Sequence, residues 1–242
     1  MKVLVLAGTS EARALIKELA ADHEVIASLA GATRQPLPLG CPTRIGGFGG
    51  ALEQENYIKN NGFDVVLDAT HPFAARISMR TFEICSAAKI PYLQILRPGW
   101  QNGPGDQWIW IDKEQEAAAH IDENAVVFLA TGRQTLQHFS NLSPRKTICR
   151  QIDPPEGDFP FENGEYCIGT PPFSVEDELH NFNKLHISHL VVKDAGGAPS
   201  RTKLDAARQL GIPVVLIRRP AQPNGPRVET VEAALRWIEA RE

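Results

Sequence analysis

The sequence predicts an α/β protein with mostly parallel sheets, arranged as two domains. Short runs rich in Val, Leu and Ile alternate with segments whose apolar residues recur at helical spacing, and the connections are short. A continuous apolar run such as KVLVLA at 2–7 is typical of a strand covered on both faces. Because about ten such strands exceed one comfortable open sheet, we predict a first domain at 1–120 and a second at 121–242.

The first half begins with a strand at 2–7 and a helix over 10–22, in which Ser10 is placed to cap and Glu11 lies in the first turn. A strand at 24–30 completes a βαβ unit. The following elements are a short strand at 43–45, a helix at 51–62, a strand at 63–70, a helix at 74–89, strands at 90–98 and 108–112, and a helix at 113–123.

The second half repeats this alternation. Its predicted strands are 125–133, 147–153, 165–173, 188–197 and 212–220. Its predicted helices are 174–186, 200–211 and 230–242, the last preceded by a Pro-rich loop over 218–230.

Composition limits the kinds of function. Lys and Arg number 25 against 29 Asp and Glu, a net charge of −4, so no global positive field attracts nucleic acid or an anionic membrane. The four cysteines (Cys41, Cys85, Cys149 and Cys167) show no metal or disulfide spacing, and we expect reduced, buried thiols and no metal. The apolar amino-terminal run is too short for a signal or a membrane span, so we expect a cytoplasmic protein.

Parallel sheets bind ligands at the carboxyl ends of their strands. After the first strand come Gly8, Thr9 and Ser10, at the start of a predicted helix. The free N–H groups of that helix and the hydroxyls of Thr9 and Ser10 could donate to a nucleotide pyrophosphate. An ordinary capped turn fits the same residues equally well. After the second strand no acidic residue stands where a ribose would be held. Arg34 is in reach and favours a 2′-phosphate, hence NADP, unless it is a solvated surface residue.

A glycine-rich stretch follows the third strand and comprises Gly46, Gly47, Phe48, Gly49 and Gly50. We expect it to let a ligand approach the main chain, because glycine has no Cβ; the alternative is a flexible loop. Asp68, Thr70 and His71 follow the next strand of the predicted sheet. His71 is a candidate for binding a cofactor or donating a proton. The alternative is a histidine with a purely structural role in the loop.

Basic and glycine residues gather at the ligand edges of the second half. Arg133, Lys193, Arg201 and Lys203 are candidates for a local basic lining for a polycarboxylate, and Gly196 and Gly197 again open the backbone. The alternative is that these cations are merely solvated, which we favour for Lys203.

Five motifs in this order, LAGTSEAR, IGGFGG, DATHPFA, TGRQ and VKDAGG, give the chain a resemblance to the precorrin-6A reductase family of cobalamin biosynthesis. The resemblance spans nearly the whole chain. It implies two Rossmann-like domains, the first binding NADPH and the second a precorrin-type macrocycle. It also implies transfer of hydride to a carbon–carbon double bond, with a proton added to the neighbouring carbon; the macrocycle is metal-free or contains cobalt.

Within this resemblance, Gly8, Thr9, Ser10, Glu11, Arg34, Thr70 and the 46–50 loop are expected to bind the cofactor, and Arg133, Lys193, Gly196, Gly197 and Arg201 the substrate. A short-chain dehydrogenase is disfavoured because no Tyr-x-x-x-Lys pair exists, and a methyltransferase because no GxGxG loop appears. A non-catalytic NADP-binding sensor remains the alternative. We expect a monomer or small homo-oligomer without nucleic-acid or membrane partners.

Overall fold

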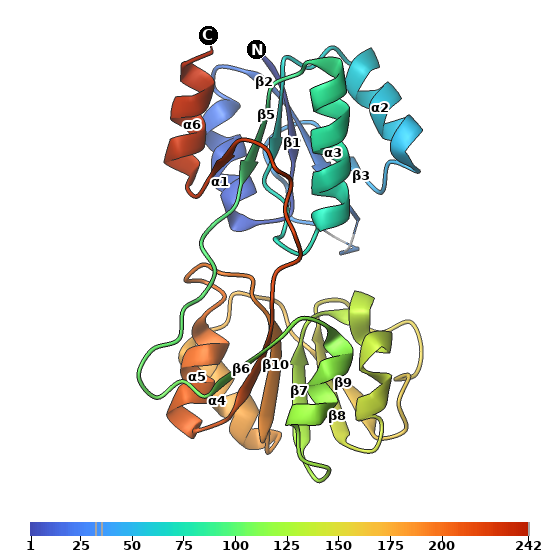
Figure 1. Ribbon diagram of the computed structural model, residues 1–242, viewed down its shortest axis with the longest axis vertical. Coiled ribbons are helices and arrows are strands. Elements are labelled where there is room, and N and C mark those ends of the chain that lie inside the picture. The colour runs from blue at the N-terminus through green and yellow to red at the C-terminus, as the bar shows by residue number, and fades with distance from the viewer. Residues whose placement is uncertain (32, 35, 242) are drawn as a thin grey trace. The chain divides into compact units, whose positions relative to one another are not determined.

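The protein is described by a computed structural model that covers residues 1–31, 33, 34 and 36–241. The chain folds into two compact units, each built on its own sheet (Figure 1). Unit 1 comprises Met1–Pro98 and Pro220–Glu242, and unit 2 comprises Gly99–Arg219. The predicted α/β class with two parallel sheets is confirmed.

Unit 1 contains a six-stranded sheet in the order β12-β5-β4-β1-β2-β3, with every pairing parallel. Relative to the order of strands in the chain, this is the 3-2-1-4-5-6 arrangement of the Rossmann fold, which binds ligands where β1 and β4 part. The strands are β1 (Lys2–Leu6), β2 (Glu24–Leu29), β3 (Thr43–Ile45), β4 (Val65–Asp68), β5 (Tyr92–Ile95) and β12 (Arg227–Val228).

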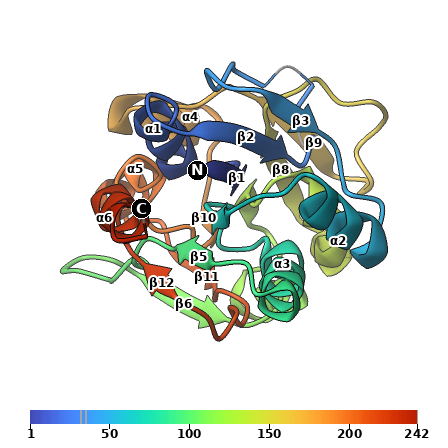
Figure 2. The same cartoon turned by 90° about the horizontal axis from the view of Figure 1, so that it is seen from above.

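Helices cover both faces of this sheet (Figures 1 and 2). On one face, α1 (Ser10–Leu19) and α6 (Val231–Glu239) pack over alternate strand residues such as Val3 and Val5. On the other, α2 (Ala51–Asn60) and α3 (Ala75–Ala88) pack over Leu4 and Leu6. Burial on both faces explains why β1 is apolar at almost every position.

Unit 2 also contains a six-stranded parallel sheet, in the order β6-β11-β10-β7-β8-β9. Its order differs from that of unit 1, because its first strand, β6, lies at one edge beside its last strand, β11. Here the sheet parts between β7 and β10. The strands are β6 (Trp108–Ile111), β7 (Val126–Ala130), β8 (Lys146–Gln151), β9 (Gly164–Ile168), β10 (His189–Lys193) and β11 (Val214–Ile217). The helices are α4 (Val175–Lys184) and α5 (Thr202–Leu210), with 3-10 helices η1 (Glu114–His120) and η2 (Arg133–Leu142).

The units differ from the predicted domains in their boundaries. The strand β6 precedes residue 120 but pairs with β11 of unit 2, whereas β12 and α6 follow residue 121 yet complete unit 1. The sheet of unit 1 therefore takes its sixth strand from outside the continuous run that supplies the other five, whereas all six strands of unit 2 lie within Gly99–Arg219. A two-residue edge strand such as β12 has no recognisable pattern, so the sequence analysis assigned that segment to a loop.

Other local predictions also need correction. The helix expected at 113–123 is a 3-10 helix, and η2 occupies a segment for which no helix was predicted. Of the four cysteines, Cys85 and Cys149 are buried as expected, whereas Cys41 and Cys167 are only half-buried.

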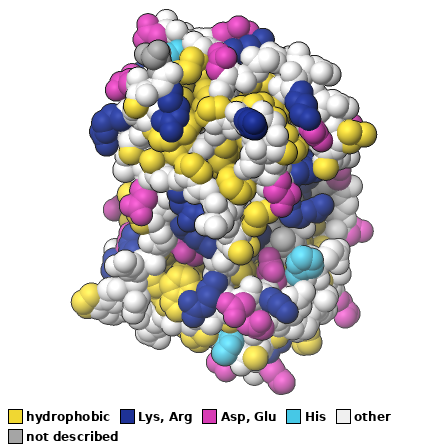
Figure 3. Space-filling model, turned by 45° about the horizontal axis from the view of Figure 1, so that its top comes forward, with side chains coloured by type: hydrophobic (Ala, Val, Ile, Leu, Met, Phe, Trp, Pro, Cys, Tyr) yellow, Lys and Arg dark blue, Asp and Glu magenta, His cyan; other side chains and the backbone are white. Residues whose placement is uncertain are grey.

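Two surface features bear on partners. Within the described residues no helix has both the length and the apolar character needed to cross a membrane. On the face drawn in Figure 3, Lys and Arg side chains are interspersed with Asp and Glu. Binding of an anion on that face would therefore depend on a local arrangement of cations.

Candidate functional site

The loops after β1 and β4 meet where the sheet of unit 1 parts. Leu6 and Asp68 are register partners at the ends of these strands. The Thr9 hydroxyl donates to the Ala69 carbonyl at 2.8 Å and accepts from the Ala12 amide at 3.1 Å. Thr9, rather than the predicted Ser10, is thus the N-cap of α1, because the cap is the extended residue just before the first helical turn.

The first turn of α1 also contains an ion pair. Glu11 Oε2 accepts from Arg97 Nη1 at 2.7 Å and from the Ser10 hydroxyl at 3.1 Å. Arg97 follows β5, so this cation comes from the third strand end along the same edge. The predicted Glu11 is present at the edge, but its carboxylate is paired; the sequence analysis did not identify Arg97.

The glycine-rich stretch 46–50 is an ordered turn held by Arg44 of β3. Arg44 donates from Nη1 to Ser28 Oγ at 2.8 Å and from Nη2 to the Gly47 carbonyl at 3.0 Å. Its guanidinium lies 3.8 Å from the centroid of the Phe48 ring, a cation–π distance. These contacts argue against the flexible-loop interpretation, and Arg44 is a second residue that the sequence analysis missed.

Glycine is required at two positions of this turn. Gly46 and Gly49 have φ of 114° and 91°, a region that side chains rarely allow. Among the described residues, no atom lies within 4 Å of a Cβ built on Gly46 or on Gly8, so both main-chain segments are open to a ligand. The predicted Arg34 lies in the neighbouring loop after β2 and is exposed.

The DATHPFA loop is fixed by a buried carboxylate. Asp68 is 1% exposed and accepts from the Thr70 amide at 3.1 Å, the Thr70 hydroxyl at 2.7 Å and the Tyr92 hydroxyl at 2.8 Å. Burial and the nearby negative charge of Asp68 raise the pKa of the Tyr92 hydroxyl. The same two causes raise the pKa of the Cys85 thiol to about 12. Tyr92 therefore remains a proton donor to Asp68.

His71 lies in the middle of this loop, between Thr70 and Pro72, and its hydrogen bond indicates the tautomer of the neutral ring. Its Nδ1 accepts from the Phe73 amide at 3.2 Å, which places the proton of the neutral ring on Nε2. The adjacent Pro72 carbonyl accepts from Gln222 Nε2 at 2.9 Å. The neutral ring thus presents Nε2–H as a hydrogen-bond donor, the form that positioning requires, whereas proton donation requires the ring to be protonated first.

The corresponding edge of unit 2 is formed by the loops after β7 and β10. Lys193 Nζ donates to Thr135 Oγ1 at 2.9 Å and lies 3.9 Å from Glu114 Oε1, which joins the two loops. Burial lowers the pKa of Lys193, with Glu114 opposing that shift. Arg133, at the start of η2, is exposed. Gly196 and Gly197 have φ of 65° and 78° and form the turn after β10.

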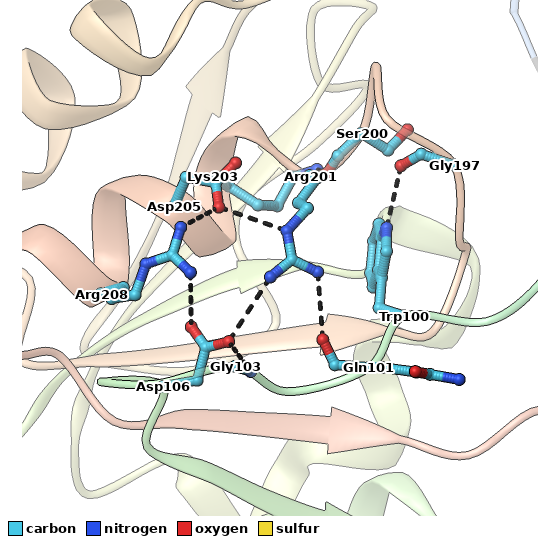
Figure 4. Close-up of polar contacts among 10 residues, drawn as sticks. All are labelled: Trp100, Gln101, Gly103, Asp106, Gly197, Ser200, Arg201, Lys203, Asp205 and Arg208. Carbon is cyan, nitrogen blue, oxygen red and sulfur yellow. Dashed lines mark hydrogen bonds and ion pairs between the residues drawn. The ribbon is translucent and has the colours of Figure 1, made fainter.

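Arg201 lies in a network of polar contacts drawn in Figure 4. It donates to Asp205 Oδ1 at 3.2 Å, to the Gln101 carbonyl at 3.2 Å and to Asp106 Oδ2 at 3.4 Å. Arg208 lies 3.8 Å from the other oxygen of Asp106, whose side chain is 0% exposed. The predicted substrate cation is therefore balanced by two carboxylates and holds the loop 101–106 against α5.

Three further charged side chains of unit 2 are partly or fully withdrawn from water. Lys203 donates to the Ser200 carbonyl at 2.6 Å, and burial lowers its pKa to about 8 despite the attraction of Glu178. Arg150 and Glu178 form a bidentate pair whose side chains are 9% and 1% exposed. The prediction of a solvated Lys203 does not fit this burial. The Arg150–Glu178 pair was not anticipated.

The sheet of unit 1 thus has Rossmann order, the sheet of unit 2 is a parallel sheet of different strand order, and each presents glycine turns and polar side chains at the ligand edge. This defines a two-unit α/β protein with a ligand edge on each unit. A family model described as "Precorrin-6x reductase CbiJ/CobK" matches residues 2–239. The chain belongs to this family, and it is an oxidoreductase of cobalamin biosynthesis that needs a reducing cofactor.

Individual relatives agree with the family model. A precorrin-6A reductase of Rhodobacter capsulatus is 39% identical over 239 residues, covering 98% of this chain and 95% of the relative. One of Rhodococcus erythropolis is 39% identical, with 98% and 97% covered. A cobalt-precorrin-6A reductase of Priestia megaterium is 27% identical, with 95% of each covered. A solved structure, "CobK precorrin-6A reductase", superimposes with a TM-score of 0.95 at 38% identity, over 99% of this chain and 96% of that one.

Proposed function

We propose that this protein reduces one carbon–carbon double bond of metal-free precorrin-6A with NADPH. The observation that carries the proposal is the match to precorrin-6A reductases over nearly the whole chain, together with a Rossmann-order sheet whose edge loops suit a dinucleotide. The metal-free substrate is favoured because relatives named for precorrin-6A are 36–39% identical, whereas those named for the cobalt form are 26–27% identical.

In this proposal, unit 1 binds NADPH at the edge between β1 and β4. The main-chain N–H groups of Thr9, Ser10 and Glu11 take the pyrophosphate at the positive end of α1. The Thr9 hydroxyl is excluded as a donor to phosphate, because its proton is already given to Ala69. Arg97 offsets the charge of Glu11 beside this anion.

The remaining cofactor contacts come from three neighbouring loops. Arg34 takes the ribose 2′-phosphate, which distinguishes NADPH from NADH. The nucleotide lies close to the main chain of two loops. One is the 46–50 loop, which comprises Gly46, Gly47, Phe48, Gly49 and Gly50, and the other is the turn at Gly8. Thr70 contributes by holding the loop after β4 in place beside the cofactor, because its hydroxyl donates to Asp68.

Unit 2 binds the polycarboxylate macrocycle. Arg133 and Lys193 pair with substrate carboxylates, and the turn at Gly196 and Gly197 allows a flat ring to approach the backbone. Arg201 serves this site indirectly in our proposal, because two carboxylates already neutralise it and it shapes the adjacent 101–106 loop.

The chemistry needs a hydride, a proton and the exclusion of water. When bound, NADPH supplies the hydride, becomes NADP⁺, and the double bond becomes a single bond with two new C–H bonds. His71 is the proposed proton donor to the neighbouring carbon: after protonation by solvent to the imidazolium it donates from Nε2–H and becomes neutral, and exchange with solvent restores the form whose Nδ1 accepts from the Phe73 amide. A cytoplasmic location is part of the proposal and is supported by the four free thiols.

The test is an anaerobic assay of the purified protein with precorrin-6A and with its cobalt-containing analogue. We expect NADPH oxidation to match the spectral change of the macrocycle, with slower reaction for NADH and for the cobalt form. Binding of NADPH without its oxidation would instead identify a non-catalytic sensor.

The role of His71 needs a separate variant. His71→Ala is expected to lower kcat by about 10²-fold, the usual contribution of a general acid, with NADPH affinity changed by less than about threefold. His71→Asn, which keeps an acceptor for the Phe73 amide, separates loop geometry from proton donation. Full activity of His71→Asn would refute the proton-donor role.

A further inference from the structure

Two buried side chains at the ligand edge of unit 2 have polar atoms that the fold leaves unpaired. Thr131 directly follows β7 and Gln151 ends β8, and these residues are 9% and 7% exposed. Among the residues that the structure describes, neither Thr131 Oγ1 nor Gln151 Nε2 has a hydrogen-bond partner. A buried polar atom without a partner is unfavourable, so this pair calls for a partner from outside the chain. Neither residue was assigned a role above.

The register of the sheet brings the two side chains together. Leu129 of β7 pairs with Cys149 of β8, so that two residues further along Thr131 stands beside Gln151. In a parallel sheet, neighbouring residues at the same register point to the same face, and so do alternate residues of one strand. The Thr131 hydroxyl and the Gln151 amide therefore form one polar pair on one face of unit 2.

A lysine stands on the other side of Thr131. Ala130 pairs with Val192 of β10, so the residues that follow them, Thr131 and Lys193, are also neighbours. Lys193 Nζ donates to Thr135 Oγ1 of η2 at 2.9 Å, which places the ammonium group on the face covered by that 3-10 helix. The polar pair therefore has a cation beside it.

The main chain next to Thr131 is open. Gly132 has φ of 74°, a region that side chains rarely allow, and none of the described atoms lies within 4 Å of a Cβ built on it. Gly132 is also the N-cap of η2, and no described side chain caps that end of the helix. The first N–H groups of η2 thus adjoin the Thr131 hydroxyl, and a helix N-terminus attracts negative charge.

We propose that Thr131, Gln151 and the first turn of η2 form a subsite for one carboxylate of the substrate. A hydroxyl and an amide nitrogen can both donate, and a carboxylate accepts through two oxygens. Lys193 adds positive charge, which Glu114 Oε1 at 3.9 Å offsets in part, so neutral donors supply much of the recognition. The inference rests on the proposed function for the polycarboxylate ligand, and all its contacts belong to unit 2.

The first test is the stability of the ligand-free protein. Thr131→Val and Gln151→Met replace the unpaired atoms with apolar groups of similar size, so each should raise the Tm or keep it within about 1 °C. Thr147→Val, near the other end of β8, is the matched control. The buried Thr147 hydroxyl donates to the Arg145 carbonyl at 3.3 Å, and its loss should lower the Tm by about 2–4 °C.

The second test is the binding of precorrin-6A without NADPH, so that no reduction takes place. Thr131→Val and Gln151→Met should each raise the dissociation constant about tenfold, the usual effect of losing a hydrogen bond to a charged group. Thr131→Ser keeps the hydroxyl and should stay within about threefold. Gln151→Glu introduces a like charge and should raise the constant about 100-fold. The control Thr147→Val should bind like the wild type.

Kinetics and spectroscopy report the contact in two further ways. With NADPH present, Gln151→Met should raise KM for the macrocycle and leave kcat within about twofold, because a carboxylate remote from the reacting carbons is bound equally in the ground and transition states. In ¹⁵N-labelled protein, the side-chain amide signals of Gln151 should shift when precorrin-6A is added. Those of Gln107, which donates to the Gly211 carbonyl at 3.5 Å, should not shift.

The outcomes separate the subsite from the proposed function. Unchanged affinity for precorrin-6A in both Thr131→Val and Gln151→Met would overturn the subsite, even if the wild type reduces the macrocycle. A lower Tm in both variants together with that unchanged affinity would identify a structural pair held by ordered water. If the wild type binds precorrin-6A without oxidising NADPH, and both variants lose affinity, the subsite stands and the proposed reduction is refuted.

Discussion

The Thr9 hydroxyl bonds the Ala69 carbonyl at 2.8 Å and so joins the loops that follow β1 and β4. The same oxygen caps α1 by accepting from the Ala12 amide. Thr9→Val keeps the shape of the side chain but loses both bonds, and we expect it to destabilise unit 1 by about 1–2 kcal/mol. Urea denaturation measures this cost. Thr9→Ser should retain most of the stability, and a valine variant as stable as wild type would show that the bridge contributes nothing.

Arg34 and Arg44 should affect cofactor binding in different ways. Arg34→Ala is expected to weaken NADPH binding by roughly 10–100-fold with little effect on NADH, because a charge-assisted contact to the 2′-phosphate is lost. Arg44→Ala should weaken both cofactors to a similar degree, since Arg44 holds the Gly47 carbonyl and the Phe48 ring. Fluorescence titration of each variant with both cofactors checks this. Equal losses in Arg34→Ala would reject the 2′-phosphate assignment, and exposed Lys17→Ala serves as the control.

Lys203 predicts a pH dependence of stability. Burial lowers its pKa to about 8, from 10.5 in the unfolded chain, so folding disfavours its charged form. The unfolded state therefore binds more protons between these values, and stability rises as pH increases through this window. Relative to Lys203→Met, the wild-type protein should gain on the order of 1–3 kcal/mol between about pH 8 and 10.5. Denaturation curves at four pH values test this, and parallel profiles of the two proteins would contradict it.

The Arg150–Glu178 pair predicts a large effect from one conservative change. Both side chains are almost fully buried, so Glu178→Gln leaves the Arg150 charge without its counter-ion. We expect a loss of about 3–5 kcal/mol in the free energy of unfolding. Replacing both residues, as in Arg150→Met with Glu178→Leu, should recover part of that loss because no buried charge remains. A double variant less stable than either single variant would exclude this account.

Much of the fold could be predicted from the sequence because it depends on local signals. The strands β1, β4 and β11 are apolar at nearly every position, since helices cover both faces of each sheet. The loops at the ligand edges were also predicted, because they follow those strands directly. The strand at β6 was assigned to the first domain and the segment of β12 to a loop of the second, since their partners are set by long-range pairing that leaves no local pattern.

The candidate site was less accessible to sequence reasoning. Arg44, Arg97 and Arg201 look alike in a sequence, yet in the structure one holds a glycine turn, one pairs with a helix terminus and one is locked between carboxylates. Such roles depend on which groups the fold brings within hydrogen-bonding distance. Asp194 is a similar case. It accepts hydrogen bonds from the Trp100 amide and from Arg219 Nε, which lie 94 and 25 residues away in the sequence.

The late position of β12 and α6 in the chain also governs the order in which the units are completed during synthesis. All of unit 2 is translated before β12 and α6, so its sheet can close while the sheet of unit 1 still lacks its last strand and one covering helix. Until then the apolar surface under α6, including Val3, Val5 and Leu93, has no cover from that helix. The nascent chain therefore presents uncovered apolar surface on unit 1, an aggregation risk that lasts until α6 has left the ribosome and packed.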